Sequence, residues 1–171
     1  MSGYIHLYTG NGKGKTTAAL GLALRAAGAG KKVFIIQFVK GMHYAEIESL
    51  KRFESEIELK QYGRDCFISH KPVPEDIVLA KQGLAVAAEI ISSGNYDMII
   101  LDEACIAIHF KLFSINELLD VIKMRPASME IVITGRYAPP ELIEIADLVT
   151  EMKEIKHYYQ KGVVARKGIE F

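Results

Sequence analysis

A glycine-rich stretch near the start of the chain has the composition of a phosphate-binding loop. Its residues are Gly10, Asn11, Gly12, Lys13, Gly14, Lys15, Thr16 and Thr17. In the usual pattern, G-x-x-x-x-G-K-[ST], a glycine stands five positions before the glycine of the Gly-Lys pair, but here Thr9 holds that position. The loop is shorter than the common form, which disfavours ordinary γ-phosphate hydrolysis more than it disfavours polyphosphate binding.

The loop offers several kinds of group to one anion. Backbone N–H groups of a glycine-rich turn, together with the positive end of the helix that follows, bind phosphate. Lys15 adds a positive charge, Lys13 adds a second, and the Thr16 hydroxyl can ligate a magnesium ion. We therefore expect this loop to bind a nucleoside triphosphate with Mg²⁺.

A second chemical feature is the apolar run Met98-Ile-Ile-Leu, which is followed by Asp102 and Glu103. In a parallel sheet these two carboxylates would lie at the carboxyl edge, where ligands of α/β proteins collect. One of them could bind magnesium directly, and the other could act through water or orient Thr16. We expect Asp102 and Glu103 to complete the metal site.

Other strand ends should meet the same edge. They are Gln37-Phe-Val-Lys-Gly41, Thr134-Gly-Arg136 and the run from Lys156. Polar residues that directly follow buried strands are ligand candidates. Lys40 and Arg136 are therefore expected to contact the nucleotide, whereas the five histidines show no metal-ligand spacing.

Short apolar runs alternate with longer segments of helical period, which predicts βαβ units around a mostly parallel sheet. The fold class is α/β of the P-loop NTPase-like (RecA-like) type, with helices on both faces of the sheet. Expected strands are Tyr4 to Tyr8, Val33 to Phe38, Ile57 to Gln61, Met98 to Leu101, Ile131 to Thr134 and Leu148 to Glu151. Expected helices are Lys15 to Ala27, Ala45 to Ser55, Glu75 to Ser92, Ile115 to Lys123 and Pro140 to Ala146.

Composition narrows the class of protein. The 171 residues suit a single domain, 1–171, and 21 basic residues balance 21 acidic ones, so no bulk positive field favours nucleic acid. No apolar stretch approaches the ~20 residues of a membrane span, and no secretory signal is visible. Cys66 and Cys105 form no metal or redox spacing. We expect a cytoplasmic protein that binds neither nucleic acid nor membrane.

These motifs together resemble one family, the ATP:corrinoid adenosyltransferases. The matching strings are TGNGKGKTTAA, QFVKG, IILDE, ITGR, ADLVTEM and a tail that ends in KGIEF, and they extend from Thr9 to the C-terminus. The lysine between the glycines of the shortened loop is specific to this group.

The resemblance implies that the loop holds the terminal phosphates of ATP, with the nucleotide reversed relative to most P-loop enzymes. A cobalt(I) corrinoid would then attack the ribose C5′, and triphosphate would leave intact. Lys13, Lys15 and a Mg²⁺ ion held by Thr16 and Glu103 would stabilise the leaving group. Because cobalt(I) is a strong nucleophile, the reaction needs no protein base.

The family also implies features beyond the nucleotide site. Its members displace the lower axial ligand of the corrinoid with loop aromatics; here the matching loop is Gly63 to Ser69, with Phe67 as the first aromatic and Ser69 where tryptophan is frequent. Some members cap the corrinoid with an N-terminal helix, which is expected to be missing or replaced here. A homodimer, a reduced flavoprotein as electron donor and a role in coenzyme B12 synthesis or salvage are also implied.

Two other classes of protein fit the same motifs. An ATP-dependent switch or motor module of the RecA-like kind would use the same loop and Asp-Glu strand, and would release ADP and phosphate. A small-molecule kinase generally clamps the transferred phosphate with several arginines, but the chain has six arginines and only Arg25 is near the loop in sequence. The identity of the released phosphate separates the favoured class from the switch.

Overall fold

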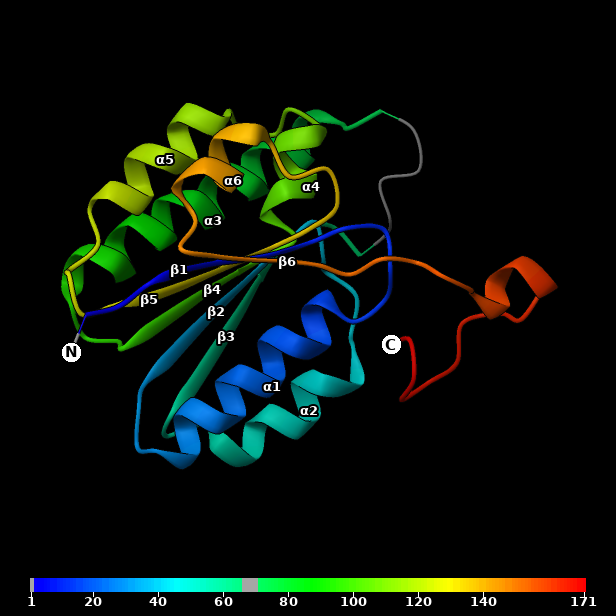
Figure 1. Ribbon diagram of the computed structural model, residues 1–171, viewed down its shortest axis with the longest axis horizontal. Coiled ribbons are helices and arrows are strands. Elements are labelled where there is room, and N and C mark those ends of the chain that lie inside the picture. The colour runs from blue at the N-terminus through cyan, green and yellow to red at the C-terminus, as the bar shows by residue number, and fades with distance from the viewer. Residues whose placement is uncertain (1, 66–70) are drawn as a thin grey trace.

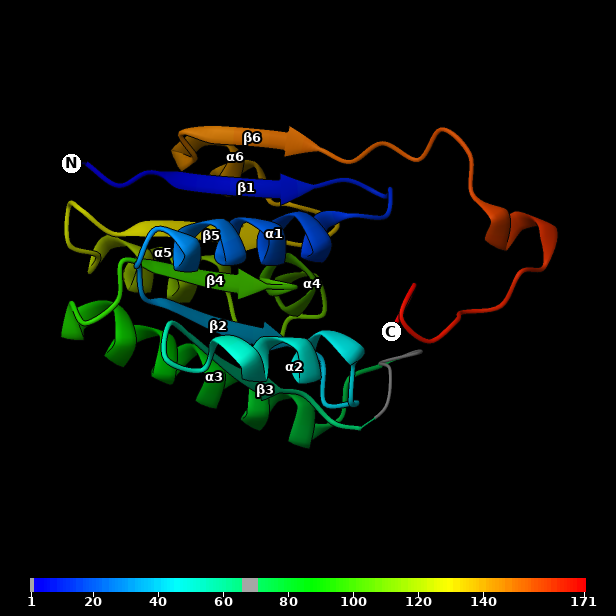
Figure 2. The same cartoon turned by 90° about the horizontal axis from the view of Figure 1, so that it is seen from below.

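One parallel sheet organises the chain. The computed structural model describes residues 2–65 and 71–171, and its six strands lie side by side in the order β3-β2-β4-β5-β1-β6. Figures 1 and 2 show the sheet from two directions. The strands are β1 (Ile5–Thr9), β2 (Val33–Phe38), β3 (Ile57–Tyr62), β4 (Met98–Asp102), β5 (Glu130–Thr134) and β6 (Leu148–Glu151). All five strand pairings are parallel, so the carboxyl ends of the strands share one edge.

Helices cover both faces of this sheet (Figure 1). On one face lie α1 (Lys15–Gly28) and α2 (Ala45–Leu50). On the other lie α3 (Pro74–Ser93), α4 (Ala104–His109), α5 (Ile115–Lys123) and α6 (Pro140–Ile145). Two short 3₁₀ helices, Lys51–Phe53 and Tyr158–Lys161, complete the regular structure of the described residues. The expected α/β fold of the P-loop NTPase-like type is confirmed.

The core follows from the apolar strands. Every residue of β2 and of β4 is buried, as near-continuous Ile, Leu and Phe predict for strands covered on both faces. Small alanines of α1, such as Ala19 and Ala23, let that helix pack closely on one face, while Ile91 and Leu118 of the other helical layer fill the second. This packing fixes the strand ends that carry the polar residues.

The expected elements are present, with local differences. The segment expected as one helix over Ala45 to Ser55 is α2 followed by the 3₁₀ helix Lys51–Phe53, and β1 starts and ends one residue later than expected. The six-residue helix α4 was not anticipated, because it directly follows the Asp102-Glu103 pair and is too short to show a helical period. It starts from Glu103, whose φ of 58° turns the chain from strand into helix.

The last residues of the chain leave the sheet. After β6 the segment 152–171 runs out from the carboxyl edge and then folds back (Figures 1 and 2). None of its residues is buried, and Ile155, Tyr159 and Val164 are strongly exposed. Among the described residues no helix is both long and apolar enough to cross a membrane.

Candidate active site

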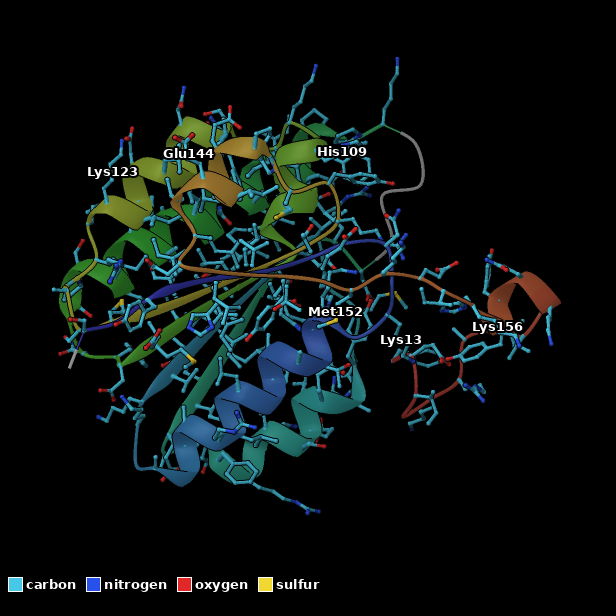
Figure 3. The ribbon with its side chains drawn as sticks, viewed as in Figure 1. Lys13, His109, Lys123, Glu144, Met152 and Lys156 are labelled. Carbon is cyan, nitrogen blue, oxygen red and sulfur yellow. The ribbon has the colours of Figure 1, made fainter. Side chains whose placement is uncertain are left out.

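The glycine-rich loop links β1 to α1 in a compact turn. Gly10 and Gly14 have φ of 95° and 120°, which side chains other than glycine rarely adopt. The Gly12 N–H donates to the Met152 carbonyl at 2.6 Å, and a Cβ at Gly10 would lie only 2.5 Å from the same oxygen. Met152, labelled in Figure 3, therefore holds the loop against the end of β6. The shortened loop needs its glycines for this close approach.

Lys15 folds back over the loop. Its Nζ donates to the carbonyl oxygens of Gly10 and Gly12, both at 2.8 Å. The side chain is buried, and burial lowers the pKa of its ammonium although the charge of Glu103 opposes this. The positive charge therefore lies at the centre of the loop, at the amino end of α1, where an anion would be bound.

Asp102 is the centre of a hydrogen-bond network at the carboxyl edge. Its Oδ1 accepts from Thr16 Oγ1 at 2.8 Å and from Thr134 Oγ1 at 2.7 Å. Its Oδ2 accepts from Lys40 Nζ at 2.8 Å and from Gln37 Nε2 at 3.2 Å. The carboxylate is thus buried but fully partnered, and it orients the Thr16 hydroxyl, which is one of the two roles proposed from sequence for this acid pair.

Glu103 lies beside this network. Its backbone N–H donates to Thr134 Oγ1 at 3.0 Å, which fixes the turn into α4. Burial, and then the charge of Asp102, raises the pKa of the Glu103 carboxyl, although the positive charge of Lys40 opposes them. Lys15 and Arg136 oppose them as well, and a cation bound near Glu103 would further favour its ionised form.

Two expected nucleotide ligands line a separate polar cleft. Asn11 of the loop and Arg136, just after β5, line it together with Glu151, Lys153 and Glu154. Its volume is about 370 Å³. Thr17, another predicted ligand of the loop, lies in the first turn of α1 and is exposed. The predicted residues of the carboxyl edge are therefore divided between this cleft and the Asp102 network.

The Lys13 side chain contacts the C-terminal segment. Its Nζ donates to the Ile169 carbonyl at 2.5 Å and to Glu170 Oε1 at 2.9 Å, with Tyr158 Oη at 3.4 Å. The Tyr158 hydroxyl also bonds to Glu170, and Arg166 stacks over the Tyr158 ring at 4.9 Å. Figure 3 shows Lys13 beside the last residues of the chain. Hydrogen bonds from Arg166, Tyr158 and Lys13 hold the pKa of Glu170 well below its usual range.

Replacing Glu170 with glutamine should loosen the C-terminal segment. Residues 152–171 are not buried, and beyond the backbone hydrogen bonds of Met152 they are tied to the loop by the contacts around Lys13 and Glu170. We expect Glu170→Gln to increase backbone amide exchange after residue 152 several-fold, measured by hydrogen–deuterium exchange, with the sheet unchanged. Glu154→Gln is the matched control, because the hydrogen bond that Glu154 makes among the described residues is a local one, from Gln160. Equal protection in Glu170→Gln and wild type would contradict this role.

Comparison with known proteins decides the family. The family model of the ATP:corrinoid adenosyltransferase BtuR/CobO/CobP matches residues 1–171. The chain belongs to the ATP:corrinoid adenosyltransferase family. It is 36% identical to the corrinoid adenosyltransferase of Pseudomonas aeruginosa over 170 residues, which are 99% of this chain and 84% of that protein. The corresponding enzyme of Escherichia coli K12 is 33% identical, with 99% of this chain and 86% of that protein covered.

A third relative, the corrinoid adenosyltransferase CobA of Salmonella typhimurium, is 32% identical over 99% of this chain and 86% of its own length. The chain is therefore an enzyme, a transferase of the family whose name specifies ATP and a corrinoid as substrates. The resemblance deduced from the motifs is confirmed. Adenosyl transfer is the activity that this family name implies.

The site of this corrinoid adenosyltransferase family member includes residues that sequence reasoning missed. Gln37 and Thr134 were noted only as parts of strand ends, yet both bind Asp102. Tyr158 and Glu170 bind Lys13 across 145 and 157 positions, and no local pattern signals such contacts. Phe67 and Ser69, expected to face the corrinoid, lie outside the described residues.

Cys105 lies near the site, but its thiol is unreactive. It is a buried free thiol in α4, and burial raises its pKa to about 12. At neutral pH the side chain is therefore protonated and is a poor nucleophile or metal ligand. Its role is packing: a Cβ added to Gly135 would lie 2.7 Å from the Cys105 Cβ.

Proposed function

We propose that the enzyme transfers the 5′-deoxyadenosyl group of ATP to the cobalt of a reduced corrinoid and releases triphosphate. The observation that carries this proposal is the arrangement of Lys15, Thr16 and Asp102 at the carboxyl edge, within a chain that matches the family over its whole length. The electron pair of cobalt(I) forms the cobalt–carbon bond. The bond between C5′ and its oxygen breaks, and that electron pair leaves with the triphosphate.

The loop suits a leaving group that remains whole. Lys15, the loop N–H groups and the amino end of α1 would bind the triphosphate and stabilise the charge it gains. The Lys13 ammonium would leave the Glu170 carboxylate and bind a phosphate oxygen instead. With the terminal phosphates of ATP in the loop, the ribose C5′ would face outward toward the corrinoid. The loop would then not need to position a water molecule for attack on phosphorus. Asn11 and Arg136 would contact the nucleotide from the neighbouring cleft.

Magnesium fits the donors that are present. Within the described residues, no group of three or more His, Cys, Asp or Glu side chains forms a metal site by itself. Mg²⁺ commonly uses one or two carboxylates and completes its shell with water and substrate phosphates. Thr16 and Asp102 or Glu103 would hold it, and the bound ion would neutralise charge on the triphosphate. Their oxygen chemistry suits this hard cation.

We also propose that residues 1–171 act as one domain, in a homodimer, in the cytoplasm, with a reduced flavoprotein as the electron donor. The corrinoid would be cobalamin or a precursor, in coenzyme B12 synthesis or salvage. The single domain and the cytoplasm were expected from length and composition, and the other proposals rest on the family alone.

One assay tests the reaction. Protein, Mg·ATP and chemically reduced cobalamin are mixed, and the absorbance spectrum is followed as a light-sensitive cobalt–carbon bond forms. We expect the spectrum of an adenosylated corrinoid, reversed by illumination. An unchanged spectrum with ATP converted to ADP would instead favour the RecA-like switch or motor module.

Phe67→Ala should separate reduction from transfer. If Phe67 replaces the lower axial ligand, its loss should reduce the rate from cobalt(II) cobalamin about tenfold more than the rate from pre-reduced cobalt(I) cobalamin. Both rates are measured spectroscopically with the same reductant. Phe53→Ala, at an exposed phenylalanine of the 3₁₀ helix after α2, is the control and should change neither. Equal losses from both cobalt states would show that Phe67 only packs.

A further inference from the structure

Lys40 holds a position between two proposed magnesium ligands. Its Nζ lies 2.8 Å from Asp102 Oδ2 and 3.3 Å from Thr16 Oγ1, and its side chain is only 13% exposed. Sequence reasoning assigned Lys40 to the nucleotide. In the structure its ammonium instead binds the same oxygens that a metal ion at this edge would use.

The backbone around Lys40 is built to hold it there. Val39 has a φ of 61°, a costly conformation for a β-branched residue. On either side the chain is tightly packed: a Cβ at Gly63 would lie 2.4 Å from the Lys40 nitrogen, and one at Gly41 would lie 2.3 Å from the Gly63 carbonyl oxygen. The two glycines therefore clamp residues 39–41 against the end of β3. A strained, clamped turn points to a functional constraint on Lys40.

The surroundings of Lys40 limit its partners. Asp102 and Glu103 come from the end of β4, Glu46 comes from α2, and the Tyr44 ring lies 5.2 Å from Nζ. Among these groups only Asp102 forms a hydrogen bond or ion pair with the ammonium that the structure shows. The four-carbon stem of lysine can redirect the charge without backbone movement. A triphosphate at Lys15 would bring several anionic oxygens to the same edge.

We propose that Lys40 makes metal binding depend on the nucleotide. Its ammonium occupies the cation position between Thr16 and Asp102 and excludes Mg²⁺ from the free enzyme, because two cations cannot share these oxygens. When Mg·ATP arrives, Lys40 transfers to a phosphate oxygen and the metal takes its place. Metal and nucleotide therefore bind together. This inference rests on the magnesium site of the proposed function.

Manganese binding to the nucleotide-free protein tests this role. Mn²⁺ is titrated into the protein, and free Mn²⁺ is measured by its electron paramagnetic resonance signal. Lys40→Met should bind one Mn²⁺ at least about tenfold more tightly than wild type, because the competing charge is removed. The same variant should bind Mg·ATP more weakly, measured by calorimetry, because it lacks one phosphate partner. The two affinities are thus expected to change in opposite directions.

Three further variants make the result specific. Lys123→Met removes an exposed lysine that also pairs with an aspartate, Asp120, at 2.9 Å, and it should leave both affinities unchanged. Figure 3 shows Lys123 far from Lys13 and the loop. Adding Asp102→Asn to Lys40→Met should abolish the gain in Mn²⁺ affinity. Lys40→Gln, which keeps an N–H donor for Asp102, replaces Lys40→Met if circular dichroism shows that the latter is unfolded.

The Mn²⁺ titration tests the role of Lys40 independently of the adenosyl-transfer reaction. If neither Lys40 variant binds Mn²⁺ more tightly than wild type, or if the gain survives Asp102→Asn, Lys40 does not reserve the metal position. The titration contains no corrinoid, so it can be read whether or not adenosyl transfer is observed. Conversely, adenosyl transfer by the wild-type enzyme can succeed even if Lys40 has only a packing role.

Discussion

Lys15→Ala is expected to lower kcat/KM for ATP by about 100-fold or more, the scale of losing one strong donor to a developing anion. The Lys15 ammonium lies buried at the centre of the loop, 2.8 Å from two carbonyl oxygens. Among the described residues, Lys15 is the one lysine whose Nζ donates to carbonyl oxygens of the loop. Alanine would remove this charge. Both the affinity for ATP and the stabilisation of departing triphosphate should fall. Initial rates with reduced cobalamin in excess, over a range of ATP concentrations, measure the effect.

Controls for this variant must separate charge from folding. Lys32→Ala removes a lysine just before β2, at the amino edge of the sheet, and should retain wild-type kcat/KM. The unfolding temperature of Lys15→Ala should be compared with wild type, because Gly10 and Gly12 lose a donor to their carbonyls. A folded Lys15→Ala enzyme with wild-type kinetics would refute the assignment of the triphosphate site.

Asp102→Asn is expected to lower the free energy of unfolding by roughly 3 kcal/mol, because it leaves the Lys40 charge without its buried partner. It also removes an acceptor from the network that Thr16, Thr134 and Gln37 complete. Denaturant unfolding of the nucleotide-free protein measures the change. Magnesium-dependent ATP binding should be lost as well, since the oriented Thr16 hydroxyl depends on this carboxylate.

A double-mutant cycle measures the energetic coupling between Lys40 and Asp102. In the Lys40→Met background, Asp102→Asn should lower the free energy of unfolding much less than it does in wild type, because no unpaired lysine remains. Asp120→Asn is the surface control: its pair with Lys123 is well exposed, so the cost should be about 0–1 kcal/mol. Additive effects of the Lys40 and Asp102 changes would show that the two side chains are not energetically coupled.

The sequence predicted the site best where a chemical group follows a strand directly. The glycine loop follows β1, Asp102 ends β4, and Lys40 and Thr134 lie at the ends of β2 and β5. Since a parallel sheet collects its carboxyl ends at one edge, these residues could be placed together without coordinates. The partners of each side chain were not predictable, because which of Asp102 and Glu103 meets Thr16 depends on the turn at Glu103.

The C-terminal segment shows where such reasoning fails. Its residues carry no helical or strand period, and they meet Lys13 across most of the length of the chain. The contact depends on side chains at two chain ends that the sheet brings to the same edge. The helix α4 was missed for a related reason: its start is fixed by a single left-handed residue, Glu103, which has no sequence signature.

The central claim is that the shortened loop holds the triphosphate as an intact leaving group. Phosphorus-31 NMR of a single-turnover reaction tests it most directly, with the enzyme, Mg·ATP and reduced cobalamin in the tube and photolysis used to count adenosylated product. The account predicts tripolyphosphate in equal amount to the light-sensitive corrinoid, and far less of both after the same reaction time with Lys15→Ala. Release of ADP with orthophosphate, or of AMP with pyrophosphate, as the stoichiometric product would contradict it.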